Sequence, residues 1–209
     1  MIEYIDVLDE HMQPVGVATR EEIHQKGYWH QTFHCCVMLQ GENQDYILFQ
    51  KRHPRKQTFP NKLDISAAGH LLQGETVEDG LRELEEELGI TAAYKDLLYL
   101  GVYKANYETE SLLNREFNHL HLLKSNLQLS DFNIQRSELS GLYKIEWRSF
   151  LDLLHGNKEK VRAIGFEYNL RGEKIEGQLD VSREDFAAQD ASWDGYFRFV
   201  FETIEKVLG

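Results

Sequence analysis

The sequence predicts a domain of the α+β class, in which a mixed β-sheet is combined with a small number of helices. Three observations support this class. Short β-prone runs recur through the first 150 residues and are separated by polar or turn-forming segments. A glutamate-rich amphipathic pattern interrupts these runs at residues 77–90. A second amphipathic pattern, at residues 193–208, lies close to the end of the chain.

The predicted strands are runs rich in β-branched, aromatic or alternating apolar residues. They comprise residues 2–8, 33–40, 46–50, 63–68, 97–105, 116–124 and 142–147. The second and third runs are joined by a short polar connection and therefore predict a hairpin. Residues 106–115 predict a polar loop between the fifth and sixth runs.

The predicted helices are identified by apolar spacing and by their end signals. Residues 20–26 predict a short helix that ends at Gly27, and Phe150 begins another. Ser182 is followed by Arg-Glu-Asp, which predicts a helix start with a cap and early acids. A C-terminal helix is predicted from the apolar positions Phe197, Val200, Phe201, Ile204 and Leu208.

The chain has 209 residues, enough for one good-sized domain or a domain with an appendage. Because Gly156-Asn157-Lys158 is a suitable break, we assign residues 1–155 to a main domain that includes the N-terminal strand. Residues 156–209 are expected to form a C-terminal extension packed on it. The sequence does not decide whether this extension packs on the sheet, covers the substrate or joins two copies, so a homodimer stays open.

Composition limits the partners and the compartment. The chain has 35 acidic and 23 basic residues and a formal charge of −12, which argues against nucleic acid and anionic membranes as main partners. No apolar run approaches the roughly 20 residues that span a bilayer. The N-terminal residues lack the pattern of a signal peptide. Cys35 and Cys36 are adjacent, poorly placed for a disulfide and expected to be reduced. We therefore expect a cytoplasmic protein.

The acidic helix carries most of the functional information. Its apolar stripe consists of Val77, Leu81, Leu84 and Leu88. Glu83, Glu86 and Glu87 lie off this stripe as a separate patch. Glu83 and Glu87 are like charges four residues apart, and residues 69–90 contain no lysine to offset them. Three neighbouring carboxylates suit Mg²⁺ or Mn²⁺; the alternative is an ordinary solvated acidic face.

Residues 69–90 resemble the Nudix box, G-x5-E-x7-R-E-U-x-E-E-x-G-U, in which U is a bulky aliphatic residue. The matching residues are Gly69, Glu75, Arg82, Glu83, Leu84, Glu86, Glu87, Gly89 and Ile90. Only six residues separate Glu75 from Arg82, one fewer than usual, so we expect a tightened turn before the helix. The resemblance implies an α/β/α sandwich in which the box forms a loop, a helix and a second loop.

The resemblance also implies roles for these residues. It implies that Mg²⁺, or Mn²⁺ in its place, is held by the carbonyl of Gly69 and by Glu83, Glu86 and Glu87. Arg82 is expected to pair with Glu75 and brace the loop against the helix. A diphosphate substrate is anionic, as this chain is, so a metal ion would bridge the two and activate water.

Outside the box, the chain resembles the Nudix branch that includes isopentenyl diphosphate isomerases, over roughly residues 1–150. The matches include Pro14-Val15-Gly16, His24, Trp29-His30, Gln50-Lys51-Arg52, Phe59-Pro60 and Ala67-Ala68-Gly69-His70. The isomerases use a cysteine where this chain has Ala68, and an acid where it has Asn114. Because a methyl group cannot transfer the proton that isomerisation requires, the resemblance favours hydrolysis.

The remaining candidate residues lie outside the acidic helix. Glu116 is expected to act as a general base or an added metal ligand, and its alternative is an exposed glutamate without a role. We predict a catalytic group of Glu116, Glu86 and Arg82. We predict phosphate binding by Arg52, Lys56 and His70.

His24 and His30 match metal-ligand positions of the isomerases, as His70 does. Because the second acid is missing, these histidines could instead be ordinary hydrogen-bonded residues, and we favour that interpretation for His24. His119 and His121 are expected to share one face of a strand, either exposed to solvent or lining a substrate cleft.

Together these features predict an Mg²⁺-dependent Nudix pyrophosphohydrolase that cleaves a small nucleoside-, cofactor- or prenyl-type diphosphate. Two alternatives remain: an isopentenyl diphosphate isomerase-like protein and a Nudix domain that binds a ligand without catalysis. The sequence does not name the substrate, because selectivity resides outside the box.

Overall fold

The structure is a computed structural model that describes residues 2–108, 113–169, 171–187 and 193–209. Its strands are β1 (Tyr4–Leu8), β2 (Pro14–Thr19), β3 (Trp29–Leu39), β4 (Tyr46–Arg52), β5 (Leu63–Ile65), β6 (Ala67–His70), β7 (Leu97–Glu108), β8 (Leu113–Ser125), β9 (Leu139–Glu146), β10 (Val161–Tyr168) and β11 (Lys174–Val181). Its α-helices are α1 (Arg20–Lys26), α2 (Arg82–Leu88), α3 (Trp147–His155) and α4 (Tyr196–Leu208). In this described part of the chain, no helix has the length and apolar character needed to cross a bilayer.

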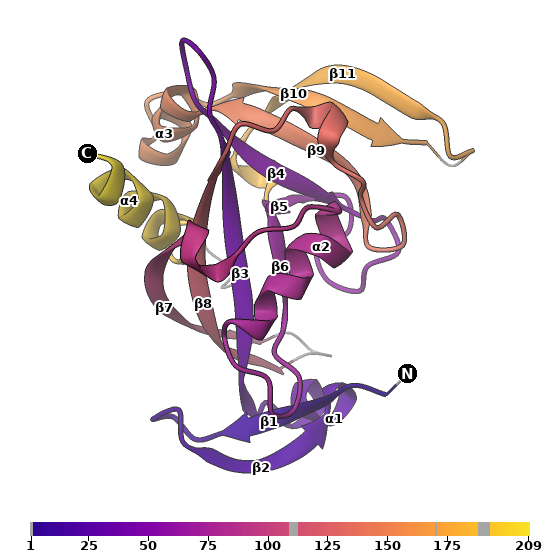
Figure 1. The fold of residues 1–209 in the computed structure, drawn as a ribbon, viewed down its shortest axis with the longest axis vertical. Coiled ribbons are helices and arrows are strands. Elements are labelled where there is room, and N and C mark those ends of the chain that lie inside the picture. The colour runs from indigo at the N-terminus through magenta and orange to yellow at the C-terminus, as the bar shows by residue number, and fades with distance from the viewer. Residues whose placement is uncertain (1, 109–112, 170, 188–192) are drawn as a thin grey trace.

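All these strands belong to one mixed sheet (Figure 1). Its main path runs β11-β10-β9-β4-β3-β1-β2, with β5 paired to β4 and both β6 and β8 paired to β3. The β3–β8 pair is parallel, whereas the β3–β4 pair is antiparallel, as the predicted hairpin requires. The predicted α+β class is confirmed.

The helices form layers on both faces of the sheet. Along β3, Cys35 and Val37 belong to a core that contains the apolar residues of α2. The alternate residues Cys36 and Met38 belong to a second core, which contains apolar residues of α3 and α4. This alternation follows from the two-residue period of a strand. The predicted α/β/α sandwich is therefore present, and both cysteines are buried and free.

One predicted strand is wrong. Residues 63–68 form two strands instead of one: β5 pairs with β4, and β6 pairs with β3. The break falls at Ser66, whose buried hydroxyl donates to the Leu48 carbonyl at 2.5 Å and accepts from the Val37 amide at 2.8 Å. Ser66 thus links the two neighbouring strands at the point where the chain changes partners. This change directs β6 towards α2.

Three strands, β2, β10 and β11, were not predicted. β10 and β11 form an antiparallel hairpin, and β10 extends the sheet from β9. The helix start at Ser182 is only a 3-10 turn, Arg183–Asp185, whereas the predicted C-terminal helix is confirmed as α4. The predicted loop at 106–115 is shorter than expected, because β7 and β8 enter this range from both sides. Its centre, residues 109–112, lies outside the described residues.

Candidate active site

Helix α2 presents an acidic face and an apolar face. A 3-10 turn at Asp79–Leu81 leads directly into it, which is the tightened turn expected from the shortened spacing. Leu84 and Leu88 are buried against the sheet. The helix ends at Gly89, whose φ of 69° is the left-handed conformation that glycine adopts without strain.

Arg82 links the loop before α2 to the acidic face. Its Nε donates to Glu75 at 2.9 Å, and its Nη2 donates to the His70 carbonyl at 2.7 Å. The same guanidinium contacts Glu83 and lies 3.4 Å from Glu86. The expected pairing of Arg82 with Glu75 is therefore present. In this arrangement Arg82 offsets part of the charge of the acidic face.

Glu83 and Glu87 point into the protein, with only 8% and 7% of each residue exposed. Glu87 accepts from Gln50 Nε2 at 3.2 Å and from the Ala68 amide at 3.1 Å. The Glu83 carboxylate packs against Gly69 so closely that a Cβ at this position would collide with it. Gly69 and Glu83 are thus in direct contact.

Burial makes the ionised form of these two carboxyl groups energetically unfavourable. It raises the pKa of Glu87 to about 8, and the nearby Glu83 adds to this effect. Burial also raises the pKa of Glu83, although Arg82 opposes the shift. Oxygen ligands that are buried together and short of positive charge fit a hard divalent cation. Glu86, by contrast, has 53% of its side chain exposed.

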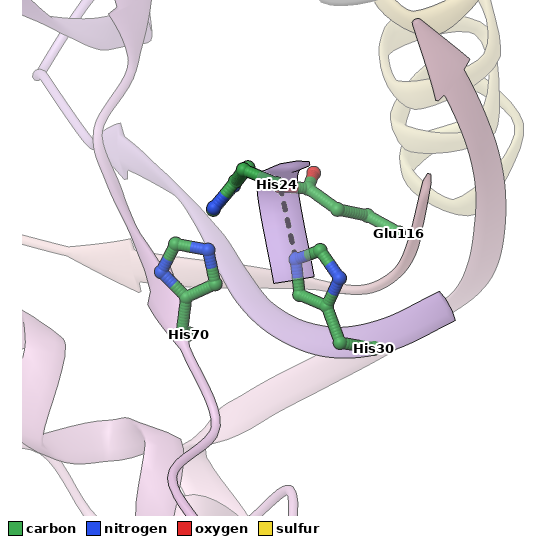
Figure 2. A group of neighbouring side chains, drawn as sticks. All are labelled: His24, His30, His70 and Glu116. Carbon is green, nitrogen blue, oxygen red and sulfur yellow. Dashed lines mark ion pairs between the residues drawn. The ribbon is translucent and has the colours of Figure 1, made fainter. Parts of the chain in front are cut away.

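A second cluster joins His24, His30, His70 and Glu116, as Figure 2 shows. Each residue offers one ligand atom, and these atoms all lie within 4.8 Å of one another. The four side chains come from α1, β3, β6 and β8. The parallel register of β3 and β8 sets His30 directly beside Glu116. Across the described ranges, this is the group of histidine, cysteine and acidic side chains that converges in this way.

The histidine nitrogens of this cluster are suitably arranged for a cation. His24 Nδ1 lies 2.8 Å from the Arg20 carbonyl, and His30 Nδ1 lies 3.0 Å from the Tyr28 carbonyl. Because a carbonyl can only accept, each Nδ1 is the donor and each Nε2 keeps its lone pair. The buried Nε2 atoms of His30 and His70 have no hydrogen-bond partner. For these two residues, the geometry favours a metal-ligand role over an ordinary hydrogen-bonded one.

The protonation states agree with this geometry. Burial lowers the pKa of His24 and, more strongly, that of His70, so both rings are neutral near pH 7. Burial alone would raise the pKa of Glu116, but His30, His34 and His70 together outweigh it and the pKa falls. Three imidazoles with one carboxylate are typical ligands of Mn²⁺, Fe²⁺ or Zn²⁺. Glu116 is buried, so the alternative of an exposed glutamate is wrong.

Known proteins resemble the chain at the level of both sequence and fold. The family model described as NUDIX domain matches residues 29–167. An uncharacterized Nudix hydrolase of Clostridium acetobutylicum is 37% identical over 202 residues, which cover 97% of each chain. The chain belongs to the Nudix hydrolase family. The membership expected from the box is therefore confirmed.

Two further relatives place this Nudix chain within its family. An isopentenyl-diphosphate Delta-isomerase of Aliivibrio fischeri is 29% identical over 155 residues, covering 73% of this chain and 83% of that protein. The resemblance to the isomerase branch is thus confirmed. A crystal structure from Deinococcus radiodurans shares the fold, with a TM-score of 0.53 and 21% identity. It covers 75% of this chain and 91% of that one.

The predicted phosphate-binding residues of this Nudix protein already have protein partners. Arg52 donates to the buried Asp64 at 3.0 Å, and Lys56 pairs with Glu138. Both cations nevertheless act electrostatically on Glu87, where they oppose the larger effect of burial. They therefore lie near the acidic face. His70 differs from the expectation, because its ring packs among the other histidines of the cluster.

Asn118 and His34 were not singled out by the sequence. Asn118 Nδ2 donates to Glu116 and to Thr32 Oγ1, both at 2.8 Å. His34 Nδ1 lies 2.5 Å from the Tyr196 hydroxyl of α4, and its pKa is lowered to about 4 by burial. These side chains form a buried polar row from the histidine cluster to the C-terminal helix. The sequence did hold a signal for them. His34 lies on the same face of β3 as His30, and Asn118 lies on the same face of β8 as Glu116, because side chains two or four residues apart on a strand share a face.

His119 and His121 share the opposite face of β8. Both are buried rather than exposed to solvent. The His121 ring stacks on Phe33 and contacts Tyr99, and His119 Nε2 lies 2.7 Å from Gln31 Oε1. Neither residue belongs to the histidine cluster.

Proposed function

We propose that this Nudix protein is a divalent-metal-dependent hydrolase that cleaves a phosphoanhydride bond of a small diphosphate. The diphosphate would carry a nucleoside, cofactor or prenyl-type group. The main support is the geometry of the acidic face, where Glu83 and Glu87 are buried side by side near Gly69. Such a pair of carboxylates has a clear chemical use beside an anionic substrate, because a shared cation joins them.

In this proposal Mg²⁺, or Mn²⁺, neutralises phosphate charge and activates water when bound. Residues of the chain hold the acidic face and the loop before α2 in place. Gln50 and the Ala68 amide hold Glu87 in one orientation. Arg82 fixes the loop at Glu75 and at the His70 carbonyl.

Glu86 and Glu116 have different roles in this proposal. Glu86 is the half-exposed acid of the face and can reach a water molecule, so it is the general base. Glu116 serves as a ligand in the histidine cluster, where an ion of the Mn²⁺, Fe²⁺ or Zn²⁺ type would be held. Of the two roles predicted for Glu116, its position among three imidazoles favours the ligand.

The second candidate is an isomerase-like activity. The histidine cluster and the similarity to an isopentenyl-diphosphate Delta-isomerase favour it. Ala68 opposes it, because this residue offers only a methyl group and a backbone amide already bonded to Glu87. Asn114 also lacks the acid that the resemblance requires.

A substrate screen tests the proposal. Purified protein is incubated with nucleoside, cofactor and prenyl diphosphates in the presence of Mg²⁺ or Mn²⁺, and released phosphate or pyrophosphate is measured. Metal-dependent release supports hydrolysis. A rearranged prenyl product without release would replace the proposal with isomerisation. Tight binding without any conversion would replace it with a binding role.

A further inference from the structure

Strand β11 is an open edge of the sheet. It pairs with β10 and with no other described strand, and Figure 1 shows it at the outer end of the sheet. Every residue from Lys174 to Asp180 is exposed. An edge strand of this kind presents a row of unpaired backbone donors and acceptors that can accept another strand.

The opposite edge of the sheet differs from β11. The edge strand β2 begins with Pro14, and its pairing with β1 is interrupted by a register shift at Val7/Leu8. Proline and irregular pairing are two ways in which proteins prevent edge strands from associating. β11 contains no proline, and its register with β10 is continuous from Val181 to Lys174. Thus β11 is less protected than β2.

The sequence of β11, Lys-Ile-Glu-Gly-Gln-Leu-Asp, is complementary to itself about Gly177. If two copies pair antiparallel around a twofold axis at Gly177, Lys174 of one copy lies opposite Asp180 of the other. Ile175 then lies opposite Leu179, and the symmetry repeats each pair. Opposite charges and apolar pairs in these positions are the combinations that stabilise antiparallel strands.

The side chains concerned are available for these contacts. Ile175 and Leu179 share one face of β11 and are 50% and 37% exposed. Lys174 and Asp180 lie on the other face. Within the monomer, Lys174 Nζ lies 3.9 Å from the centre of the Phe166 ring, and Asp180 lies 3.7 Å from the exposed Arg162. Both residues remain exposed, and a Cβ added at Gly177 would meet nothing within 4 Å.

We propose that β11 is a self-association surface through which two copies of this chain form a symmetric dimer with one continuous sheet. The second copy is favoured over another partner because the charge pattern of β11 complements itself. β11 lies at the end of the sheet away from β1 and α1, the helix that carries His24 (Figure 1). The two active sites would therefore remain separate and complete in each copy.

The test exchanges the charges of the proposed pair. Lys174→Asp places two like charges opposite each other, and so does Asp180→Lys, whereas the double variant restores opposite charges. We expect the dimer dissociation constant to rise about tenfold in each single variant and to return towards the wild-type value in the double variant. Sedimentation equilibrium over a range of protein concentrations measures this constant. Lys95→Asp, at an exposed site outside β11, is the matched control.

Weakening in both single variants, recovery in the double variant and no change in the control support the proposal. A wild-type protein that stays monomeric up to several hundred micromolar would overturn it. A dimer that is insensitive to both single changes, or one that the double variant fails to restore, would also overturn it. Circular dichroism should show the same secondary structure in all variants, because the altered side chains are exposed.

Discussion

The acidic face of α2 and the histidine cluster are both candidate cation sites, but they are built in different ways. The acidic face comes from one helix, and Arg82 already offsets part of its charge. The histidine cluster comes from four separate elements, and two of its nitrogens have no hydrogen-bond partner. The comparison teaches that spacing along one helix reveals the first kind of site. The second kind depends on the path of the whole chain.

The two sites also differ in chemistry. Carboxylates alone suit the hard cations Mg²⁺ and Mn²⁺, whereas imidazoles with one carboxylate suit transition metals. If both sites bind metal, replacing one divalent ion with another should affect the two sites differently. Mutations in one region should leave the ion preference of the other unchanged.

Glu87→Gln should cause the largest loss. It removes a carboxyl group that can ionise when a cation binds but keeps the shape and a hydrogen-bonding group, so we expect turnover to fall by a factor of about 10³ or more with little change in fold. Hydrolysis of the diphosphate found in the screen measures this loss. Glu85→Gln is the matched control, because Glu85 is an exposed residue of the same helix. Equal activity in both variants would remove Glu87 from the site.

His30→Ala should affect the other region. It removes a nitrogen that lies 3.7 Å from Glu116 and has no hydrogen-bond partner, so we expect the affinity for Mn²⁺ or Zn²⁺ to fall about 10- to 100-fold. Mg²⁺ binding at α2 should be unchanged. Equilibrium dialysis with metal analysis measures both ions. The exposed His11→Ala is the control. If wild-type protein and His30→Ala retain the same amount of metal, the cluster is not a metal site.

Arg82→Lys should have the smallest effect of the three. Lysine keeps the positive charge but loses the planar fork that joins Glu75, Glu83 and the His70 carbonyl. We expect a loss of about tenfold in kcat and a fall of about 1 kcal/mol in the free energy of unfolding. Steady-state kinetics and urea unfolding provide these values. Unchanged kinetics would show that the brace does not support catalysis.

The sequence could predict α2 and the apolar side that buries Leu84 and Leu88, because both depend on neighbours three and four residues apart. It could not predict that His24, His30, His70 and Glu116 converge. That result requires the parallel register of β3 with β8 and the separate path of β6. For the same reason, the sequence favours an ordinary hydrogen-bonded role for His24, whereas the structure places this residue in the cluster.

The sequence did not predict the hairpin of β10 and β11 because of residues within these two strands. Gly165 and Gly177 interrupt the two strands and lie opposite each other. Glycine in the middle of a strand weakens the alternating pattern by which strands are recognised. The strands β3 and β4 lack such an interruption, and their hairpin was predicted correctly.

Isothermal titration calorimetry with Mg²⁺, in the presence of a non-hydrolysable diphosphate, measures whether the carboxylates of α2 bind a divalent cation. We predict that the wild-type protein and His30→Ala take up Mg²⁺ with similar affinity, and that Glu83→Gln combined with Glu87→Gln abolishes the uptake. Wild-type protein that takes up no divalent cation, with or without the diphosphate, would contradict the account. The same is true if the double variant binds Mg²⁺ as well as the wild type does.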